Sequence, residues 1–253
     1  MEKIGKHTYE YFEEINPGIR RYIPTNKAVL DVGGGFGALG EEFEKKGNKV
    51  CNIDSSEYAI GESRKRVAES YIADICDADK LPPEIKNRKF DVIVFADILE
   101  HVYDPFSVLE MYKKFLEKDG HVFISVPNVA TWTTRLGILF SNFDYSDVGT
   151  LDRTHIRFFT EKSIKRMVKS AGFQIEKFDI TPNFAKPFVP LLKKIIRKDD
   201  ENHDPKAIIK SRYYQGYLKY AYPIERIIAK IWPSLFAFQF ILILKKNKNG
   251  ERL

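Results

Sequence analysis

The feature that most constrains this chain is a short apolar run that ends in an acid and passes directly into alternating glycines. Residues 28–37 read Ala-Val-Leu-Asp-Val-Gly-Gly-Gly-Phe-Gly, with Gly33, Gly35 and Gly37 at alternate positions. A buried parallel strand reads as a continuous apolar run, and glycines after it let the backbone turn sharply while a ligand lies against bare main chain. The segment therefore predicts a strand, a turn and a helix that hold a nucleotide-like cofactor.

Further strand-like runs alternate with helical patterns along the chain. Repeated strand–helix units imply a parallel sheet with helices on both faces, and ligands bind such sheets outside the carboxyl ends of the strands. A final strand is expected after a long insertion. Strands are expected near 27–32, 48–53, 70–74, 90–95, 121–126, 173–180 and 236–244, and helices near 38–47, 57–68, 105–117 and 161–171.

The glycine turn alone leaves two classes of cofactor open. Gly33-x-Gly35-x-x-Ala38 also satisfies the dinucleotide fingerprint, and Asp54 follows the second strand where a carboxylate accepts hydrogen bonds from a ribose diol in either class. Short-chain sugar-nucleotide oxidoreductases need a Tyr-x-x-x-Lys pair, and none of the 13 tyrosines has Lys four residues later. This absence disfavours an NAD(P) enzyme.

The ends of the third and fourth strands separate the two classes. Ala73-Asp74-Ile75 ends the third strand, and Ala96-Asp97-Ile98-Leu99-Glu100-His101 follows the fourth. With these motifs, residues 27–128 resemble the class I S-adenosylmethionine (SAM) dependent methyltransferases, whose pattern is LDxGxGxG, an acid after each of the next two strands, and D-x-LEH. The resemblance implies an α/β, Rossmann-like sheet of seven strands, the last of them antiparallel, with insertions that form a cap.

The same resemblance implies where SAM binds. The glycine turn passes the methionine moiety, Asp54 holds the ribose hydroxyls, and Asp74 accepts from the adenine amino group. Gly34 stands where a subgroup commonly carries Cys, and we expect it to face backbone. The cofactor residues implied are Tyr11, Asp31, Gly33, Gly34, Gly35, Gly37, Asp54, Ser55, Asp74, Ile75, Ala96 and Asp97, and no metal is expected.

Acceptor chemistry is predicted for the segment Leu151-Asp152-Arg153-Thr154-His155-Ile156-Arg157. An alcohol is a poor nucleophile until its proton is removed, and imidazole suits that task at neutral pH, so His155 is the expected base. Asp152 is expected to orient His155, and Arg153 and Arg157 to grip a carboxylate or phosphate. His101 either borders the acceptor or is structural, and Asp152, Arg153 and His155 alternatively only pin the insertion to the sheet.

The resemblance extends through Pro127-Asn128-Val129, residues 151–160 and Ala171-Gly172-Phe173 to bacterial and archaeal methyltransferases of cell-surface glycan genes. It implies methylation of a hydroxyl, less often an amine or phosphorylated group, on a sugar or surface-glycan (capsule) precursor. The alternatives are a small-metabolite methyltransferase and a noncatalytic SAM-fold module that supports a partner enzyme. Motifs for base methylation, [DNS]-P-P-[FYW] and Pro-Cys, are missing after the fourth strand, so no nucleic-acid partner is expected.

Composition is that of an ordinary globular α/β chain of 253 residues, with 43% apolar and 30% charged residues. The two cysteines, Cys51 and Cys76, offer neither a disulfide framework nor a metal spacing, and no signal-peptide core or membrane span is evident. A cytoplasmic protein is expected. From Lys186 onward the chain has 15 Lys and Arg against 6 Asp and Glu, whereas the preceding residues have 26 against 29.

The C-terminal part of the chain combines basic residues with tyrosines. Lys193, Lys194, Arg197 and Lys198, with five tyrosines between 213 and 222, suit an anionic or sugar-bearing acceptor that is nucleotide-linked or lipid-linked, contact with the membrane periphery, or packing against a second subunit. Four segments of the chain are expected to differ in role. They are a helical part over the cofactor cleft (1–26), a SAM-binding core (27–182 and 235–246), a substrate-side insertion (129–160) and a helical cap (183–234).

Overall fold

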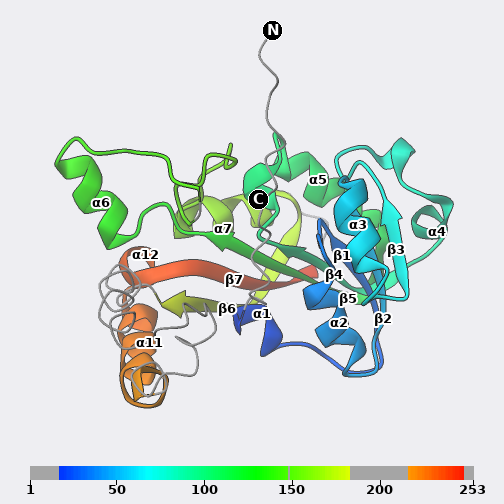
Figure 1. The fold of residues 1–253 in the computed structure, drawn as a ribbon, viewed down its shortest axis with the longest axis horizontal. Helices are drawn as coiled ribbons and strands as arrows, with labels where there is room; N and C mark the ends of the chain where they lie inside the picture. The colour runs from blue at the N-terminus through cyan, green and yellow to red at the C-terminus, as the bar shows by residue number, and fades with distance from the viewer. Residues whose placement is uncertain (1–16, 148, 183–215, 248–253) are drawn as a thin grey trace, which may run out of the picture.

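A seven-stranded sheet forms the centre of the computed structural model, which describes residues 17–147, 149–182 and 216–247 (Figure 1). The strand order is β3-β2-β1-β4-β5-β7-β6; β7 runs antiparallel to both of its neighbours, and the other pairs are parallel. The predicted fold class is therefore confirmed. The strands are β1 Ala28–Val32, β2 Lys49–Asp54, β3 Glu69–Ile72, β4 Phe90–Ala96, β5 Leu116–Pro127, β6 Phe173–Pro182 and β7 Ala237–Lys246.

Helices cover both faces of the sheet, with α1 and α2 on one side and α5 and α7 on the other (Figure 1). The helices are α1 Pro17–Arg20, α2 Ala38–Glu44, α3 Glu57–Ser63, α4 Pro83–Lys86, α5 Pro105–Tyr112, α6 Trp132–Leu139, α7 Glu161–Ser170, α11 Tyr222–Ile231 and α12 Pro233–Phe236. Single turns are η1 Ala78–Lys80, η2 Leu99–His101, η3 Lys113–Phe115 and the π-helical η5 Tyr217–Ala221.

The central strands are buried on both faces because their successive side chains point to opposite sides of the sheet. In β1, Val29 packs with Ile19 and Phe43 under α1 and α2, whereas Leu30 packs with Leu109 in the larger cluster under α5. The continuous apolar runs read from the sequence thus correspond to doubly covered parallel strands.

Several element boundaries differ from the expected ones. The helix expected over 105–117 ends at Tyr112, and β5 begins at Leu116 instead of 121. Leu116 pairs with Phe90 at the start of β4, and a register shift then brings His121 opposite Val92. Burial of Phe115 and Leu116 in the core therefore draws the chain into the sheet five residues early.

Asp179 on β6 links three elements that are far apart in the sequence. Its carboxylate is 3% exposed and accepts hydrogen bonds from Tyr22 Oη (2.8 Å) and from Arg226 of α11 (2.6 and 2.9 Å). Burial alone raises the pKa of Asp179, but the Tyr22 hydrogen bond and the Arg226 charge outweigh it and hold the pKa below its usual range. The charged carboxylate therefore attaches α11 to the sheet.

We predict that Asp179→Asn lowers the free energy of unfolding by about 2–3 kcal/mol, because hydrogen bonds to a charged group are lost in a buried position. Glu176→Gln on the same strand is the control; Glu176 pairs with His121 and Lys245 at the surface, and its loss costs about 1 kcal/mol or less. Urea unfolding at pH 7 measures both. Because the pKa of Asp179 is lowered by folding, the difference between wild type and Asp179→Asn should shrink as the pH falls below about 4.

Candidate active site

The glycine turn, the strand-end acids and the predicted acceptor residues all lie at the carboxyl edge of the parallel strands. Gly33, Gly35 and Gly37 adopt φ of 71°, 51° and 75°, a left-handed conformation that disfavours other side chains. The amide of Gly33 donates to the carbonyl of Ile53 at 2.8 Å. The turn between β1 and α2 is thereby attached to the end of β2.

Asp54 anchors the glycine turn to the end of β2. Its buried carboxylate accepts hydrogen bonds from the amide of Gly35 (3.0 Å) and from the amide of Ser56 (2.8 Å). An ionised carboxylate offers about four lone pairs, so two amides leave acceptor capacity for a ribose diol. The ribose role of Asp54 and the cofactor contact of neighbouring Ser55 stay predictions.

Asp31 is the buried group whose surroundings best fit an amino acid moiety. It is 1% exposed, and among the described residues neither carboxylate oxygen has a hydrogen-bond partner. Burial, aided by the charge of Asp54, raises the pKa of Asp31 to about 7. A ligand ammonium group, such as the one that SAM carries, would satisfy this orphaned carboxylate beside the glycine turn, so the residues present fit SAM.

Gly34 corrects one expectation from the sequence. A Cβ added there would lie 2.3 Å from Asn52 Oδ1 and 2.6 Å from Asp31 Oδ2. Gly34 thus faces two buried side chains and not backbone, and the prediction was wrong. The carboxylate of Asp31 occupies the space that a side chain at position 34 would need.

The third and fourth strand ends complete the cofactor side. Asp74 is exposed, and its carboxylate accepts from the amide of Cys76 (3.0 Å) and from Lys80 Nζ (3.3 Å), while Ile75 beside it is buried. The adenine contacts expected of Asp74 and Ile75 stay predictions. An exposed carboxylate next to an apolar side chain is compatible with them. Tyr11, another predicted cofactor residue, lies outside the described residues.

Asp97, directly after Ala96 at the end of β4, is held by residues that sequence reasoning missed. Its φ is 52°, its amide donates to the carbonyl and hydroxyl oxygens of Ser125 (both 3.1 Å), and its Oδ1 accepts from Gln239 Nε2 at 3.0 Å. The one available signal was that Gln239 is a polar residue inside an otherwise apolar final strand. Gln239 and Ser125 therefore position Asp97 from two neighbouring strands.

Glu100, His101 and His155 form a cluster that the sequence did not predict as a unit. One carboxylate oxygen and one ring nitrogen of each histidine lie within 4.8 Å of one another, and the two imidazoles meet edge to face at a centroid distance of 4.8 Å. The carbonyl of Glu100 accepts from the amides of Ile156 and Arg157, both at 2.9 Å. These bonds hold the loop that carries His155 against η2.

The other predicted acceptor residues have local partners. Asp152 Oδ1 accepts from the amide (2.8 Å) and hydroxyl (2.6 Å) of Thr154, whereas His155 Nδ1 faces the carbonyl of Thr150 at 3.1 Å. Thr150, and not Asp152, therefore orients the His155 ring. Arg153 pairs with Asp147 at 2.9 Å.

Arg157 lies over the ring of Tyr103 and donates to the carbonyl of Tyr103. Arg153 and Arg157 thus both have partners within the chain, and their predicted role in gripping an anionic acceptor stays a prediction. The alternative reading, in which Asp152, Arg153 and His155 fix the insertion to the sheet, also stays a prediction, because their side-chain hydrogen bonds reach residues of the same insertion.

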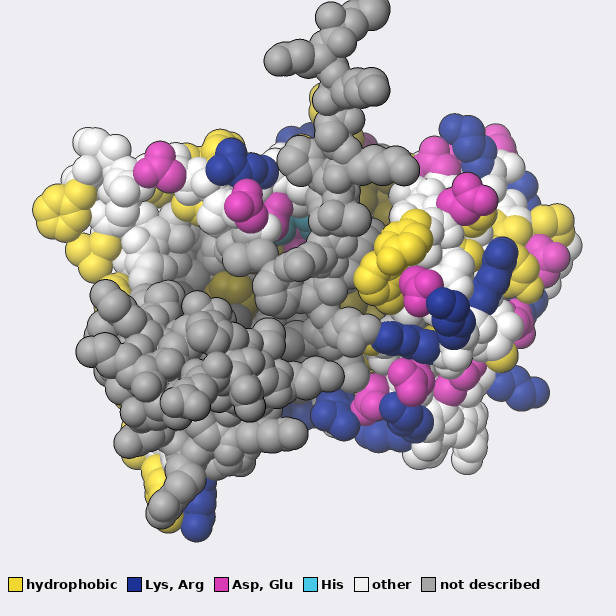
Figure 2. All heavy atoms as spheres, viewed as in Figure 1, with side chains coloured by type: hydrophobic (Ala, Val, Ile, Leu, Met, Phe, Trp, Pro, Cys, Tyr) yellow, Lys and Arg dark blue, Asp and Glu magenta, His cyan; other side chains and the backbone are white. Residues whose placement is uncertain are grey.

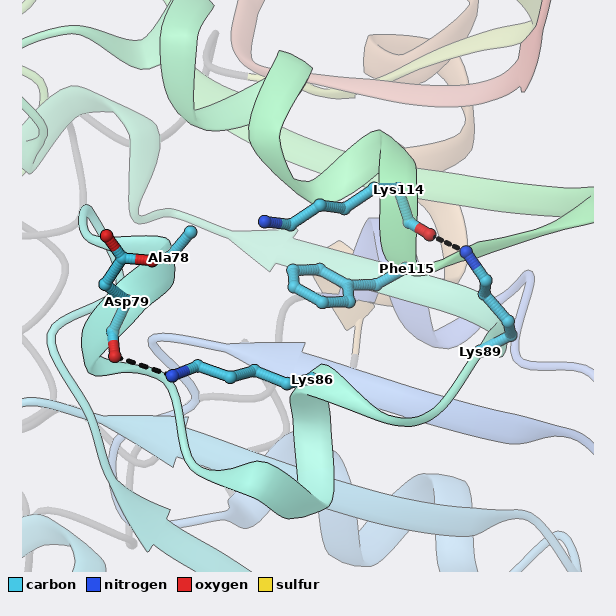
Figure 3. Close-up of a pocket in the computed structure, with 6 residues that line it drawn as sticks. All are labelled: Ala78, Asp79, Lys86, Lys89, Lys114 and Phe115. Carbon is cyan, nitrogen blue, oxygen red and sulfur yellow. Dashed lines mark hydrogen bonds between the residues drawn. The ribbon is translucent and has the colours of Figure 1, made fainter.

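A second concave region lies away from this edge (Figure 3). Lys86, Lys89, Lys114 and Phe115, which line it, precede β4 or β5 along the chain, so it lies toward the amino ends of those strands. Lys86 Nζ donates to the carbonyl of Asp79 at 2.6 Å, and Lys89 Nζ donates to that of Lys114. The region is also lined by Ala78 and Asp79 of η1, and none of its lining residues is a predicted cofactor residue.

Comparison with known families agrees with the site. A family model described as a methyltransferase domain matches residues 7–177, and the chain therefore belongs to that family of SAM-dependent methyltransferases. Among solved structures, a SAM-dependent methyltransferase from Archaeoglobus fulgidus has a TM-score of 0.56 at 19% identity, with 90% of this chain and 91% of that one covered. A putative methyltransferase from Bacillus halodurans has a TM-score of 0.54 at 18% identity, with coverage of 89% and 95%.

Curated relatives bear the name ubiquinone biosynthesis O-methyltransferase. The Idiomarina loihiensis protein is 31% identical over 152 residues, which are 58% of this chain and 62% of the relative. The Thiobacillus denitrificans protein is 29% identical over 178 residues, which are 67% and 76%. These names contradict the expected sugar or surface-glycan acceptor and favour the alternative of a small-molecule methyltransferase. The error arose because residues 127–129, 151–160 and 171–173 were assigned to one subgroup by resemblance alone.

The surface of the described residues carries both charged and apolar regions. Figure 2 shows acidic and basic side chains intermixed over α2 and α3, and hydrophobic side chains at α6, where Ile138, Leu139 and Phe140 are exposed. Lys193, Lys194, Arg197 and Lys198 lie outside the described residues. None of the described helices is both long and apolar enough to cross a membrane.

We predict that Asp54→Ala weakens binding of S-adenosylhomocysteine about tenfold to several hundredfold, because hydrogen bonds to a charged carboxylate are worth about 1.5–3 kcal/mol each. Calorimetric titration measures the affinity. Asp54→Asn keeps one acceptor oxygen for the turn and guards against simple unfolding, and Asp119→Ala, exposed near the start of β5, is the control with unchanged affinity. Unchanged affinity in folded Asp54→Ala would reduce Asp54 to a loop anchor.

Proposed function

We propose that this protein transfers a methyl group from SAM to a hydroxyl oxygen of a small molecule, with a quinone precursor as the first candidate class. The observation that carries the proposal is the Glu100, His101 and His155 cluster, which lies at the same sheet edge as the glycine turn. The names of the relatives support the oxygen acceptor and the small-molecule class. The match covers only 62% of the length of the Idiomarina relative. We therefore infer the substrate class from the names of the relatives together with the histidine cluster.

Bound SAM supplies an electrophilic methyl group on a sulfonium, so the chain mainly needs to align an acceptor oxygen and exclude water. The glycine turn, Asp31 and Asp54 bind the donor at the ends of β1 and β2. Asp97 is held by hydrogen bonds with Ser125 and Gln239. In this proposal it lies at the end of β4, between the donor and the acceptor. The acceptor hydroxyl loses its proton at the histidine cluster, where we propose that His155 is required.

The segment boundaries remain part of this proposal. Residues 27–182 and 235–246 hold SAM, whereas 129–160 faces the acceptor through His155. The predicted cap over 183–234 is described only from residue 216, where α11 exposes Ile224, Ile227 and Ile231. An apolar acceptor tail, the membrane periphery or a second subunit would each suit such a face, and these contacts stay predictions.

We predict that His155→Ala slows methyl transfer by about 10² to 10⁴ and leaves S-adenosylhomocysteine affinity within about twofold of wild type, because the residue acts on the acceptor and not on the donor. The measurement is the initial rate with a dihydroxylated phenol as acceptor. His121→Ala is the matched control, since His121 pairs with Glu176 away from this edge. A His155→Ala protein with the wild-type rate and native melting temperature would assign His155 to structure alone.

A further inference from the structure

We infer that Glu100, His101 and His155 form a binding site for one divalent cation of the Zn²⁺ type, which holds the acceptor hydroxyl. No metal-ligand spacing is evident in the sequence, because His155 lies far along the chain from Glu100 and His101. The fold brings one oxygen and two ring nitrogens within 4.8 Å of one another. Two imidazoles and one carboxylate are one of the donor sets found in catalytic zinc sites, which keep a fourth position open for water or substrate.

The backbone orients both imidazoles as metal ligands. His101 Nδ1 lies 3.2 Å from the carbonyl of Thr154, and His155 Nδ1 lies 3.1 Å from that of Thr150. Because a carbonyl oxygen only accepts, each Nδ1 carries the proton and each Nε2 presents its lone pair. Metal-bound histidines are typically fixed in this way, by a carbonyl or carboxylate on the second ring nitrogen.

Glu100 supplies an independent indication of a cation. It is 1% exposed, and among the described residues neither of its carboxylate oxygens has a hydrogen-bond partner. A buried carboxylate without a partner is costly, and the charges that act on it here come from Asp97 and Asp152, which are acidic. A divalent ion would offset this local negative charge.

The geometry needs only a small contraction to bind an ion. With metal–ligand distances of about 2.0–2.2 Å, tetrahedral ligands lie about 3.3–3.6 Å apart. Rotation of the three side chains would close the remaining gap, and the hydrogen bonds from Ile156 and Arg157 to the Glu100 carbonyl hold the backbone on both sides of the site. The ion would therefore bind between η2 and the loop 151–157.

The site adjoins the donor. A Cβ added at Gly33 would lie 2.4 Å from Ile98 Cγ1, so the segment that leads into η2 packs directly on the glycine turn. This role of the ion rests on the proposed function. The ion would lower the pKa of the bound acceptor hydroxyl, and the hydroxyl proton would leave to water. The oxygen then forms a bond to the methyl carbon, the carbon–sulfur bond breaks, and sulfur keeps the electron pair.

The test is calorimetric titration of chelator-treated, desalted full-length protein with Zn²⁺. We expect one Zn²⁺ per chain, a higher melting temperature with Zn²⁺, and affinity reduced by at least about 10- to 100-fold in Glu100→Gln, His101→Ala and His155→Ala. Glu100→Gln keeps the side-chain shape and guards against misfolding. The control is His121→Ala, a second histidine beside a glutamate, which should bind Zn²⁺ like wild type. Absence of saturable binding, or binding unchanged in all three variants, would overturn the site.

Methyl transfer separates this inference from the proposed function. Chelation should reduce the wild-type rate with a dihydroxylated phenol, and added Zn²⁺ or another divalent ion should restore it. Full activity in the chelated protein would overturn the role of the ion and leave O-methylation standing. Stoichiometric Zn²⁺ binding that the three variants lose, in a protein that methylates no hydroxyl, would support the metal site and reject the proposed acceptor.

Discussion

The hydrogen bonds from the amides of Gly35 and Ser56 to the carboxylate of Asp54 are the constraint on which the site depends. They join the turn after β1 to the turn after β2 through one buried acid. Among the described residues, the Asp31 carboxylate beside Gly34 has no hydrogen-bond partner, and a ligand ammonium group would fit there. Ile98 then packs on Gly33, so the position of the donor loop also sets the position of η2 and its acidic and histidine side chains.

The fold was predictable from the sequence because its signals are local. Apolar runs of strand length, glycines directly after them and acids at successive strand ends specify a parallel sheet and its ligand edge, and the antiparallel final strand followed from the family resemblance. Element ends were less predictable, since burial of Phe115 and Leu116 starts β5 before the sequence pattern does. Sequence pattern does not register such tertiary packing.

On the acceptor side, the side-chain contacts differ from the expected ones for a physical reason. His101 and His155 meet only through the fold, and Asp152 satisfies a short-range bond to Thr154 instead of reaching the imidazole. Motifs that follow strand ends describe SAM contacts shared by many methyltransferases, whereas the acceptor depends on an insertion. The glycan assignment rested on a resemblance at residues 127–129, 151–160 and 171–173, and the relatives named for ubiquinone biosynthesis overturned it.

In the proposed reaction, the methyl group of SAM reaches a hydroxyl oxygen of a small molecule. Incubation of the protein with SAM labelled with ¹³C at the methyl group, in the presence of a dihydroxylated phenol, a simple sugar and a primary amine, tests it by nuclear magnetic resonance of the products. We expect a methyl ether on the phenol, formed in equal amount with S-adenosylhomocysteine. A label that appears only on the amine or the sugar, or SAM that is neither bound nor consumed, would contradict it.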